Sequence, residues 1–530
     1  MSAEEGVAVI LPEYLVDAEP RETCEGPSRN ASYGTSSQRL RQYCSYLIRG
    51  ETCHSSRCDS FHDLDEFVAH YAPPETGLPC PFLEEYGVCP YSVNCLFGTH
   101  FRTSLADLRA KKYPPLRDQL VKYQNAFTTD VAAELRRSTF RQNPVPTRQR
   151  ANLRELLSTK GCAVLAPMCT IGSLPFRRLC VEYGCPVTLS EMVFARDILQ
   201  GNKAELTKIR RHPSERCFGI QLTGRGQELI DAALFIAQRC DCDFIDLNAA
   251  CPQELATKRC CGAAIGSNRK RLQSAVNCLL QVGLRHGIPI TVKLRAGDLW
   301  GNWQGIASAL LLRETRITAI SMHARSAKQR YSKLADWNYL MRTKRALETG
   351  IDPDDPNDKP EGIVALDPDS IPLLGGNGDI FHWNDLEDPQ HAAVDYVLIG
   401  RGAAIKPWIF QELREHKTLD PSSKERLEML RRFANYCLEY YGTDAIGTER
   451  ARAQFLENWS FMCRYIPVGI MGAPQRINQR PPSFRGRDDL ETLMSSTKAH
   501  AWVTLSEQLF GPVPTGFTFV PKHKSSECAS

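Results

Sequence analysis

The chain has 530 residues, and 65 Lys and Arg against 61 Asp and Glu give a formal net charge of +4. This balance excludes a uniformly basic nucleic-acid coat but leaves room for local basic patches. The 42% hydrophobic and 24% charged content is typical of a globular protein, and the length predicts about three domains. The first residues fit neither a secretory signal nor a membrane span, so we expect a cytoplasmic or nuclear protein that does not attach to membranes.

Residues 1–40 lack periodicity and are expected to form a flexible N-terminus. The next segment, 41–102, is rich in cysteine, histidine and aromatic residues but poor in aliphatic ones, so it needs another source of stability. Its two sets of candidate metal ligands are Cys44, Cys53, Cys58 and His62, then Cys80, Cys89, Cys95 and His100. Three thiolates and one imidazole complete a tetrahedral zinc shell with no open position, which predicts two structural Zn²⁺ sites. Scattered buried cysteines are the alternative, but the segment has few aliphatic residues to bury them.

Both spacings resemble those of CCCH zinc fingers, and this resemblance implies RNA binding by stacking of bases on aromatic rings. The rings available are Tyr43, Tyr46, Phe61, Phe82, Tyr86, Tyr91, Phe97 and Phe101. Residues 103–157 follow as a basic connector that several prolines interrupt.

Residues 158–409 alternate short apolar runs with stretches of helical periodicity. The apolar runs cover 162–168, 186–192, 217–222, 243–251, 288–297, 318–325, 371–379 and 396–402. Eight strands that alternate with helices predict an α/β fold, a TIM (β/α)8 barrel. A doubly wound open sheet is the alternative, but its glycine-rich dinucleotide turn is missing after the first strand, which ends in Pro167 and Met168.

A C-terminal helical domain with a basic tail is expected over 410–530. Its candidate phosphate contacts are Arg464, Arg476, Arg480, Arg485, Arg487, Lys522, His523 and Lys524. A solvated charged face is the alternative for each of these residues.

Polar side chains gather at the ends of three predicted barrel strands. They are Asn248 and Cys251, then Lys293 and Arg295, then His323 and Arg325. Each one alone has a structural explanation, but together at one barrel mouth they would be costly without an anionic ligand. The glycine-rich segments 375–379 and 400–402 lie where this fold usually binds phosphate, which predicts a phosphorylated cofactor.

The segments 166–180, 246–252, 291–298, 323–337, 375–380, 399–410 and 475–494 resemble the tRNA-dihydrouridine synthases, in particular the eukaryotic branch with N-terminal CCCH fingers. The resemblance implies that FMN is bound by Pro167, Met168, Gln221, Lys293, His323, Asn377, Gly378, Asp379, Gly400 and Arg401. It further implies Cys251 as the catalytic thiol, with Asn248, Arg295, Arg325 and Tyr331 as uracil contacts. Two departures from the family pattern are Ala250 and Ala324, which stand where glycine is usual.

The implied reaction is the reduction of a variable-loop uridine in tRNA, with the hydride from FMN and the proton from Cys251. NADPH or NADH would reduce the flavin, and the target base would have to leave its stack. We expect a monomer whose partner is tRNA, with residues 410–530 as a helical tRNA-binding domain and mRNA as an open alternative. The competing hypotheses are a flavin-dependent reductase of a small molecule and a non-catalytic zinc-finger RNA-binding protein.

Overall fold

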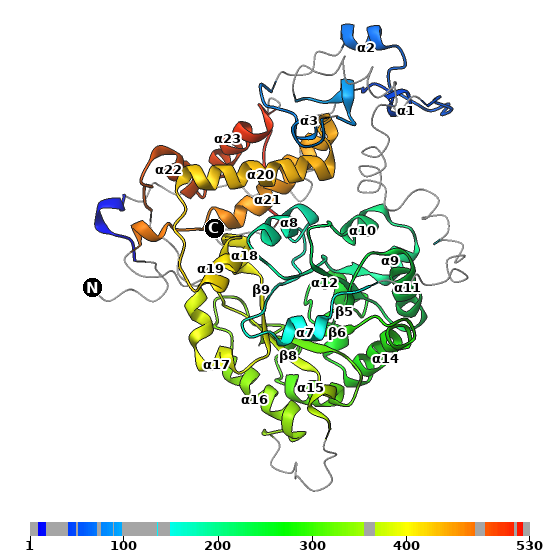
Figure 1. Cartoon of the computed structure of the whole chain (residues 1–530), viewed down its shortest axis with the longest axis vertical. Coiled ribbons are helices and arrows are strands. Elements are labelled where there is room, and N and C mark those ends of the chain that lie inside the picture. Colours follow the sequence, from blue (N-terminus) through cyan, green and yellow to red (C-terminus); the bar gives the residue numbers. More distant parts are fainter. Residues whose placement is uncertain are drawn as a thin grey trace. The chain divides into compact units, whose positions relative to one another are not determined.

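The structure is a computed structural model that describes residues 9–16, 41–48, 51–70, 76–87, 89–97, 135, 149–354, 366–471, 483–513 and 517–522. The chain divides into two compact units (Figure 1). Unit 1 contains residues 1–126, 420–475 and 480–530, and unit 2 contains 127–419 and 476–479. Most of the predicted flexible N-terminus and basic connector lies outside the described residues. Within the described ranges, no helix has the length and apolar character needed to cross a membrane.

Unit 2 is built on parallel strands. They are β1 (Ala163–Leu165), β2 (Val187–Leu189), β3 (Val193–Phe194), β4 (Cys217–Thr223), β5 (Phe244–Asn248), β6 (Ile290–Gly297), β7 (Ala319–Ser326), β8 (Leu373–Asn377) and β9 (Tyr396–Ile399). Pairing runs in the order β2-β1-β9-β8-β7-β6-β5-β4, and β2 also pairs with β4 in parallel register. This pairing closes an eight-stranded barrel, so the predicted TIM barrel is confirmed. The two-residue β3 is an addition that pairs with the end of β4.

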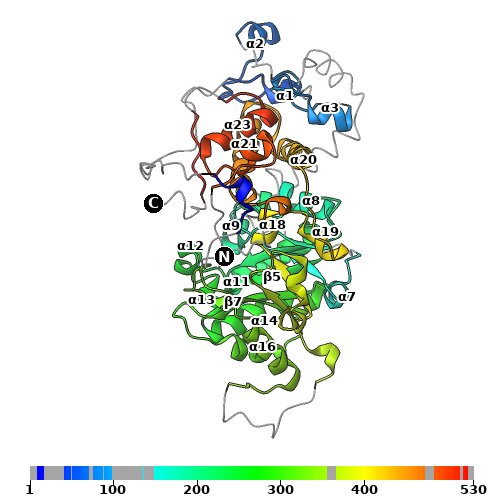
Figure 2. The same ribbon diagram turned by 90° about the vertical axis from the view of Figure 1, so that its left-hand side faces the viewer.

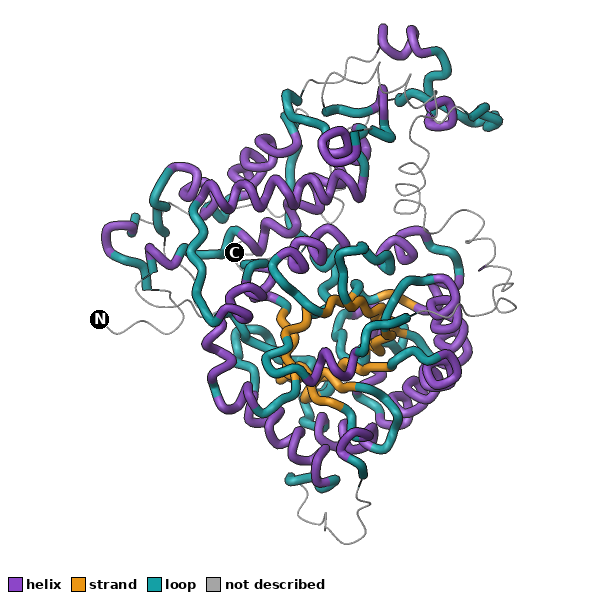
Figure 3. The backbone as a smooth tube through the Cα atoms, in the orientation of Figure 1, coloured by secondary structure: helices purple, strands orange, loops and turns teal. Residues whose placement is uncertain are grey.

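Helices surround the strands of unit 2 (Figure 3). They are α7 (Leu153–Ser158), α8 (Leu174–Glu182), α9 (Ala195–Leu199), α10 (Lys203–Lys208), α11 (Gly226–Arg239), α12 (Glu254–Lys258), α13 (Ala263–Gly266), α14 (Arg269–His286), α15 (Gly305–Arg313), α16 (Trp337–Thr349), α17 (Pro389–Ala392), α18 (Arg401–Ile405) and α19 (Ile409–Glu415), with the 3-10 turns η4 (Pro368–Ser370) and η5 (Trp383–Glu387). The longest, α14, begins where the Asn268 side chain accepts a hydrogen bond from Arg271 N and ends at Gly287 in the left-handed region.

One end of the barrel is filled by apolar side chains. Leu153 and Leu157 of α7 pack against residues at the start of the strands, including Val187, Phe244 and Tyr396. This cluster closes the N-terminal end of the barrel, which leaves its chemistry to the opposite end, where the strands finish.

Unit 1 joins the N-terminal cysteine-rich segment to the C-terminal helices. Its elements are η1 (Pro12–Tyr14), α1 (Ser45–Ile48), α2 (Leu64–His70), α3 (Pro81–Tyr86), η2 (Ser92–Asn94), α20 (Ser423–Tyr441), α21 (Ala445–Met462), η6 (Val468–Ile470), α22 (Asp489–Ser495) and α23 (Ala499–Phe510). Figure 2 shows α20, α21 and α23 grouped together. Ser422 and Glu425 form a capping box at the start of α20.

The cysteine-rich segment packs directly on this helical group. Leu96 N donates to Thr443 O at 2.9 Å, and the Tyr86 hydroxyl donates to Glu439 at 3.3 Å. The two cysteine sets also share a small apolar cluster that includes Tyr43, Phe67 and Val93.

Candidate active site

Lys293 lies at the middle of β6 and is only 8% exposed. Its Nζ donates to Asn377 Oδ1 at 3.0 Å, and Asn377 in turn donates to Leu398 O at 2.8 Å. Burial lowers the pKa of Lys293 to about 8, the nearby Arg295 adds to the shift, and Asp246 opposes it. The predicted residues Lys293 and Asn377 are therefore joined to each other, and through Leu398 the chain of hydrogen bonds links β6, β8 and β9.

His323 lies beside these groups on β7 and is only 7% exposed. Burial lowers its pKa well below the ordinary range, and four cations reinforce the shift: Arg295, Lys293, Arg325 and Arg401. The imidazole is therefore neutral at physiological pH. Its Nε2 accepts from Arg325 Nη1 at 3.3 Å, so its proton lies on Nδ1, which can donate to a ligand.

A buried hydrogen-bond chain connects β4 to the loop that carries Cys251. Gln221 Nε2 donates to Asp246 Oδ2 at 2.7 Å, and Asn248 Nδ2 donates to Gln221 Oε1 at 2.7 Å. Asn248 Oδ1 accepts from the backbone N of Ala250 at 3.1 Å and of Cys251 at 2.9 Å. The Asn248 side chain thus fixes the position of the cysteine loop. Ala250 keeps the backbone donor that this arrangement needs, so its extra methyl leaves the hydrogen bond intact.

Cys251 is partly buried at the end of β5. Burial raises the pKa of its thiol, while the Gln253 backbone and Arg295 act in the opposite direction. The thiol is therefore protonated near neutral pH and can serve as a proton donor. Its backbone O accepts from Ala263 N at 2.8 Å.

The loop that packs against Cys251 requires glycine at position 262. Gly262 has φ +57°, and a Cβ there would lie 2.5 Å from the backbone O of Cys251. Its N donates to Thr223 Oγ1 at 3.1 Å, which holds the loop against β4. Cys261 is buried, and burial raises the pKa of its thiol.

Arg295 follows Lys293 two residues later in β6 and links this strand to the loop after β5 and to the end of β7. Its Nε donates to Ala250 O at 2.8 Å, and its Nη1 donates to Ser326 O at 3.2 Å. Burial lowers its pKa, and the hydroxyl of Tyr331 opposes that shift. Tyr331 is 51% exposed, so a cation and a phenol lie together at the entrance.

Asp379 closes the other side of the mouth. It accepts from Arg401 at 2.8 Å, from Ala335 N at 2.8 Å and from Arg325. Arg325 is fully buried and also donates to Lys333 O at 2.7 Å. Every nitrogen of this guanidinium thus has a partner within the protein, so Arg325 holds the loop after β7 in place.

The glycine-rich strand ends pack closely. Gly378 has φ +139°, and a Cβ there would lie 2.6 Å from Ala335 Cβ. A Cβ at Gly400 would lie 3.6 Å from Met168 Sδ, so the residues that follow β9 and β1 lie close together. The predicted pair Pro167 and Met168 is therefore next to Gly400 and Arg401.

The charges of the mouth fit an anionic cofactor. Four buried or largely buried cations act on His323, whereas the carboxylates that contact these groups are Asp246 and Asp379. Burial raises the pKa of Asp246 as well, which weakens its negative charge. An excess of buried positive charge is costly unless a phosphate or an anionic ring compensates it. The residues present therefore fit FMN.

Two groups near the cysteine escaped the sequence analysis. Cys169 packs with Cys251 against Met192, and burial raises the pKa of Cys169 to about 12. Glu191 accepts from Thr170 N at 2.6 Å, and burial raises its pKa. The strand run 186–192 contained Glu191, but no pattern in the sequence indicated that it faces this thiol.

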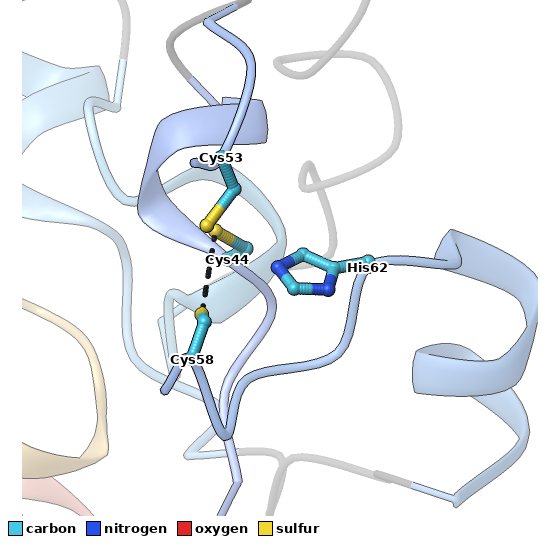
Figure 4. A group of neighbouring side chains, drawn as sticks. All are labelled: Cys44, Cys53, Cys58 and His62. Atoms are coloured by element: carbon cyan, nitrogen blue, oxygen red, sulfur yellow. Dashed lines mark hydrogen bonds between the residues drawn. The ribbon is translucent and has the colours of Figure 1, made fainter. Parts of the chain in front are cut away.

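The first cysteine set forms a compact ligand group. Figure 4 shows the sulfurs of Cys44, Cys53 and Cys58 facing one another, with the His62 ring turned toward them. All four ligand atoms lie within 4.8 Å of one another, and the sulfurs of Cys44 and Cys58 are 3.9 Å apart. Thiolates on a tetrahedral zinc are about 3.8 Å apart, so this set could hold zinc.

The second set brings Cys80, Cys89 and Cys95 together within the same limit. The sulfurs of Cys80 and Cys95 are 3.7 Å apart. The fourth predicted ligand, His100, lies outside the described residues.

Several of the aromatic rings predicted to stack on RNA are buried instead. Tyr43 is 3% exposed, Phe82 0% and Phe97 1%, so none of the three can stack on a base in this conformation. Tyr46, at 43%, is exposed. Phe101 lies outside the described residues.

Some basic residues of the helical segment also have partners within the protein. Arg487 pairs with Asp420 at 2.7 Å and with Glu491 at 2.8 Å, which reduces its value as a phosphate contact. The Arg464 guanidinium lies 5.5 Å from the centre of the Phe461 ring. Arg485 and Lys522 lie within the described residues, whereas Arg476, Arg480, His523 and Lys524 lie outside them.

A family model and relatives of known name agree on the family of this chain. A family model described as dihydrouridine synthase (Dus) matches residues 164–351 and 366–458. The chain is 34% identical over 536 residues to the "tRNA-dihydrouridine(47) synthase [NAD(P)(+)]-like" protein of Homo sapiens, which covers 89% of this chain and 78% of that protein. It is 40% identical to the "tRNA-dihydrouridine(47) synthase [NAD(P)(+)]" of Coprinopsis cinerea, over 71% of this chain and 54% of that protein. The chain therefore belongs to the dihydrouridine synthase family.

Proposed function

We propose that the protein is an FMN-dependent oxidoreductase that reduces uridine 47 of tRNA, in the variable loop, to 5,6-dihydrouridine. The observation that carries this proposal is the protonated Cys251 thiol, held by Asn248 and placed beside Arg295 in a mouth with an excess of buried positive charge. Family membership and the names of the relatives supply the substrate. Both point away from a small-molecule reductase.

FMN would be held by Gln221, Lys293 and His323 inside the barrel, and by Asn377, Gly378, Asp379, Gly400 and Arg401 with Pro167 and Met168 at the strand ends. When bound and reduced by NADPH or NADH, it supplies a hydride. The Lys293 ammonium would stabilise the negative charge of the bound FMN, because the attraction between opposite charges is strong in a buried, low-dielectric site.

Cys251 donates the proton that completes the reduction of the uracil ring, and its raised pKa keeps that proton available at pH 7. Arg295 and Tyr331 at the entrance contact the uracil. Asn248 has one N–H left for the base, because its other polar groups already hold Gln221 and the cysteine loop. Arg325 acts on the substrate indirectly, through the loop after β7.

The two cysteine sets bind structural zinc in this proposal, with His62 and His100 as the fourth ligands. Sulfur spacings of 3.9 and 3.7 Å support it. The protein acts as a monomer on tRNA in the cytoplasm or nucleus, and mRNA with an accessible uridine presents the same base.

The test is Cys251→Ala, purified with its flavin. We expect FMN content and NAD(P)H oxidation to stay at the wild-type level while dihydrouridine formation falls by about a hundredfold or more, because general-acid catalysis contributes about 10²–10⁴-fold. Dihydrouridine in unmodified tRNA would be measured by mass spectrometry of its nucleosides.

Cys260→Ala and Cys261→Ala are the matched controls, because both thiols lie in the loop that packs against Cys251. If Cys251→Ala formed dihydrouridine at the wild-type rate while one of the two controls did not, the cysteine replaced in that control would be the proton donor. A colourless wild-type protein that forms no dihydrouridine would favour the non-catalytic RNA-binding alternative.

A further inference from the structure

Two loops at the barrel mouth expose large apolar and aromatic side chains. The first, residues 298–304, follows β6 and the second, residues 327–336, follows β7; together they are called the mouth rim. Trp300 is 64% exposed, Trp303 42%, Tyr331 51% and Leu334 68%. Exposed aromatic groups of this size, gathered beside a catalytic entrance, indicate a binding surface.

The first loop presents Trp300 on a fixed backbone. Asp298 Oδ1 accepts from Trp300 N and from Asn302 N, both at 2.8 Å, and Gly301 has φ +96°. The Trp303 ring packs 4.8 Å from the Tyr339 ring, which anchors the end of the loop. The backbone that carries the exposed Trp300 ring is thus fixed, so less backbone entropy is lost when the ring binds a partner.

The second loop lies against the first and against the site. Ala327 N donates to Gly297 O and Asp298 O, both at 3.3 Å. Arg295 Nη1 donates to Ser326 O, the residue just before this loop. A Cβ on Gly301 would lie 3.8 Å from Lys328 Cδ, so the lysine stem lies beside the Trp300 loop.

The charge of the rim is positive. Lys328, Arg330 and Lys333 are exposed, and the structure records no ion pair for them within its described ranges. The acidic residues of the rim face inward: Asp298 is 6% exposed and Asp336 caps α16. Aromatic rings among unpaired cations match a nucleic acid, which offers base faces and phosphates.

We propose that the mouth rim binds an unpaired nucleotide of the tRNA next to the target uridine, with Trp300 stacked on its base and Lys328 and Arg330 on the flanking phosphates. This inference rests on the proposed function, because it names how the same site holds its RNA. Single-stranded, splayed-out bases are the form in which RNA presents such faces.

The experiment compares the full-length, flavin-loaded protein with Trp300→Ala, Trp300→Phe and Lys328→Ala in titrations of labelled, unmodified tRNA. Trp300→Ala should weaken binding about five- to 150-fold, the range expected for one stacked base, and Trp300→Phe should restore most of it. Lys328→Ala should lower the slope of log affinity against log salt by about 0.7, whereas Trp300→Ala should leave that slope unchanged.

Leu284→Ala and Arg285→Ala are the matched controls. Leu284 is 56% exposed, and Arg285 is exposed beside it, in the last turn of α14. Because that turn leads into the start of β6, both lie at the closed end of the barrel, and both variants should bind tRNA as the wild type does. An FMN content and a melting temperature equal to the wild type would show that Trp300→Ala is folded.

Equal tRNA affinity in Trp300→Ala and Leu284→Ala would overturn the rim proposal, while dihydrouridine formation by the wild type would leave the proposed function standing. If instead the wild type formed no dihydrouridine but Trp300→Ala still lost RNA affinity, the proposed function would fail and the rim would stand as an RNA surface.

Discussion

Lys293 provides a test of the cofactor site by pH alone. Its pKa is lowered to about 8, chiefly by burial, so its ammonium is present below that pH and is lost as the pH rises through it. Because FMN is anionic, the affinity of flavin-free protein for FMN should fall between about pH 7 and 9. Removing one charge-assisted hydrogen bond is worth about 1.5–3 kcal/mol, so Lys293→Met should bind FMN about ten- to a hundredfold more weakly at pH 7.

Quenching of FMN fluorescence during titration measures this affinity. The control is Lys160→Met, an exposed lysine outside the site, which should keep both the wild-type affinity and its pH dependence. The assignment of Lys293 would be refuted by a Lys293→Met protein whose FMN affinity still fell over the same pH range as the wild type.

The residues that gather at the barrel mouth could be predicted from the sequence, but the contacts that each one makes there could not. Lys293, Arg295 and His323 could be identified because an i, i+2 pattern at strand ends aims side chains into the same mouth. The role of Arg325 depended on Asp379, Lys333 and the register between β7 and β8, which no local pattern encodes. Sequence therefore predicted a substrate contact where the structure has a fully buried anchor.

At the scale of elements, each of the eight predicted strand runs coincides with one barrel strand, and only β4 and β7 extend past their runs, by one residue each. Apolar runs bounded by polar residues fix the position of a buried strand, whereas the extra β3 is too short to produce such a run. Burial of the finger aromatics was missed for a different reason. Tyr43 packs against Phe67 and Val93 within its own segment, while α3, which carries Phe82, packs on helix α20 far along the chain. Composition reveals neither contact, so it suggested exposed rings.

The packing of the second cysteine set on α20 gives a prediction for Cys89→Ser. Cys89 is fully buried, with its sulfur 3.6 Å from Thr443 Oγ1, whereas Cys53 of the first set is only partly buried. Both Cys89→Ser and Cys53→Ser should lose about one zinc per chain, because each removes a ligand from a four-ligand site. Only Cys89→Ser should also weaken the helical group that α20 belongs to.

Metal analysis by plasma mass spectrometry would count the zinc, and hydrogen exchange over residues 423–441 would report on α20. Faster exchange is expected in Cys89→Ser than in Cys53→Ser. Equal exchange in the two variants would mean that the second set does not stabilise these helices.

At the scale of the molecule, the division into two units predicts how a deletion of residues 1–101 behaves. The barrel belongs to the other unit, so the shortened protein should keep its FMN and oxidise NAD(P)H. Its helical segment should be destabilised, because Thr443 and Glu439 lose their bonds to Leu96 and Tyr86. Any loss of tRNA affinity would then reflect both absent fingers and altered helices.

Calorimetry can separate the two effects. Excess FMN raises the unfolding temperature of the unit that binds it, which identifies the barrel transition. We expect that transition to be unchanged by the deletion and the other to move down or disappear. A barrel transition that fell with the deletion would contradict the independence of the two units.

Unit 1 is assembled from both ends of the chain, and this has a consequence for synthesis on the ribosome. Tyr86 and its partner Glu439 are 353 residues apart, which at about 5–20 residues per second means a delay of roughly 20–70 s between their emergence. During that interval the whole barrel is made, and the cysteine-rich segment has no helical surface to cover it. Early capture of zinc by the nascent chain would give this segment a fold of its own while it waits, so zinc shortage during translation should lower the yield of the protein more than zinc removal afterwards.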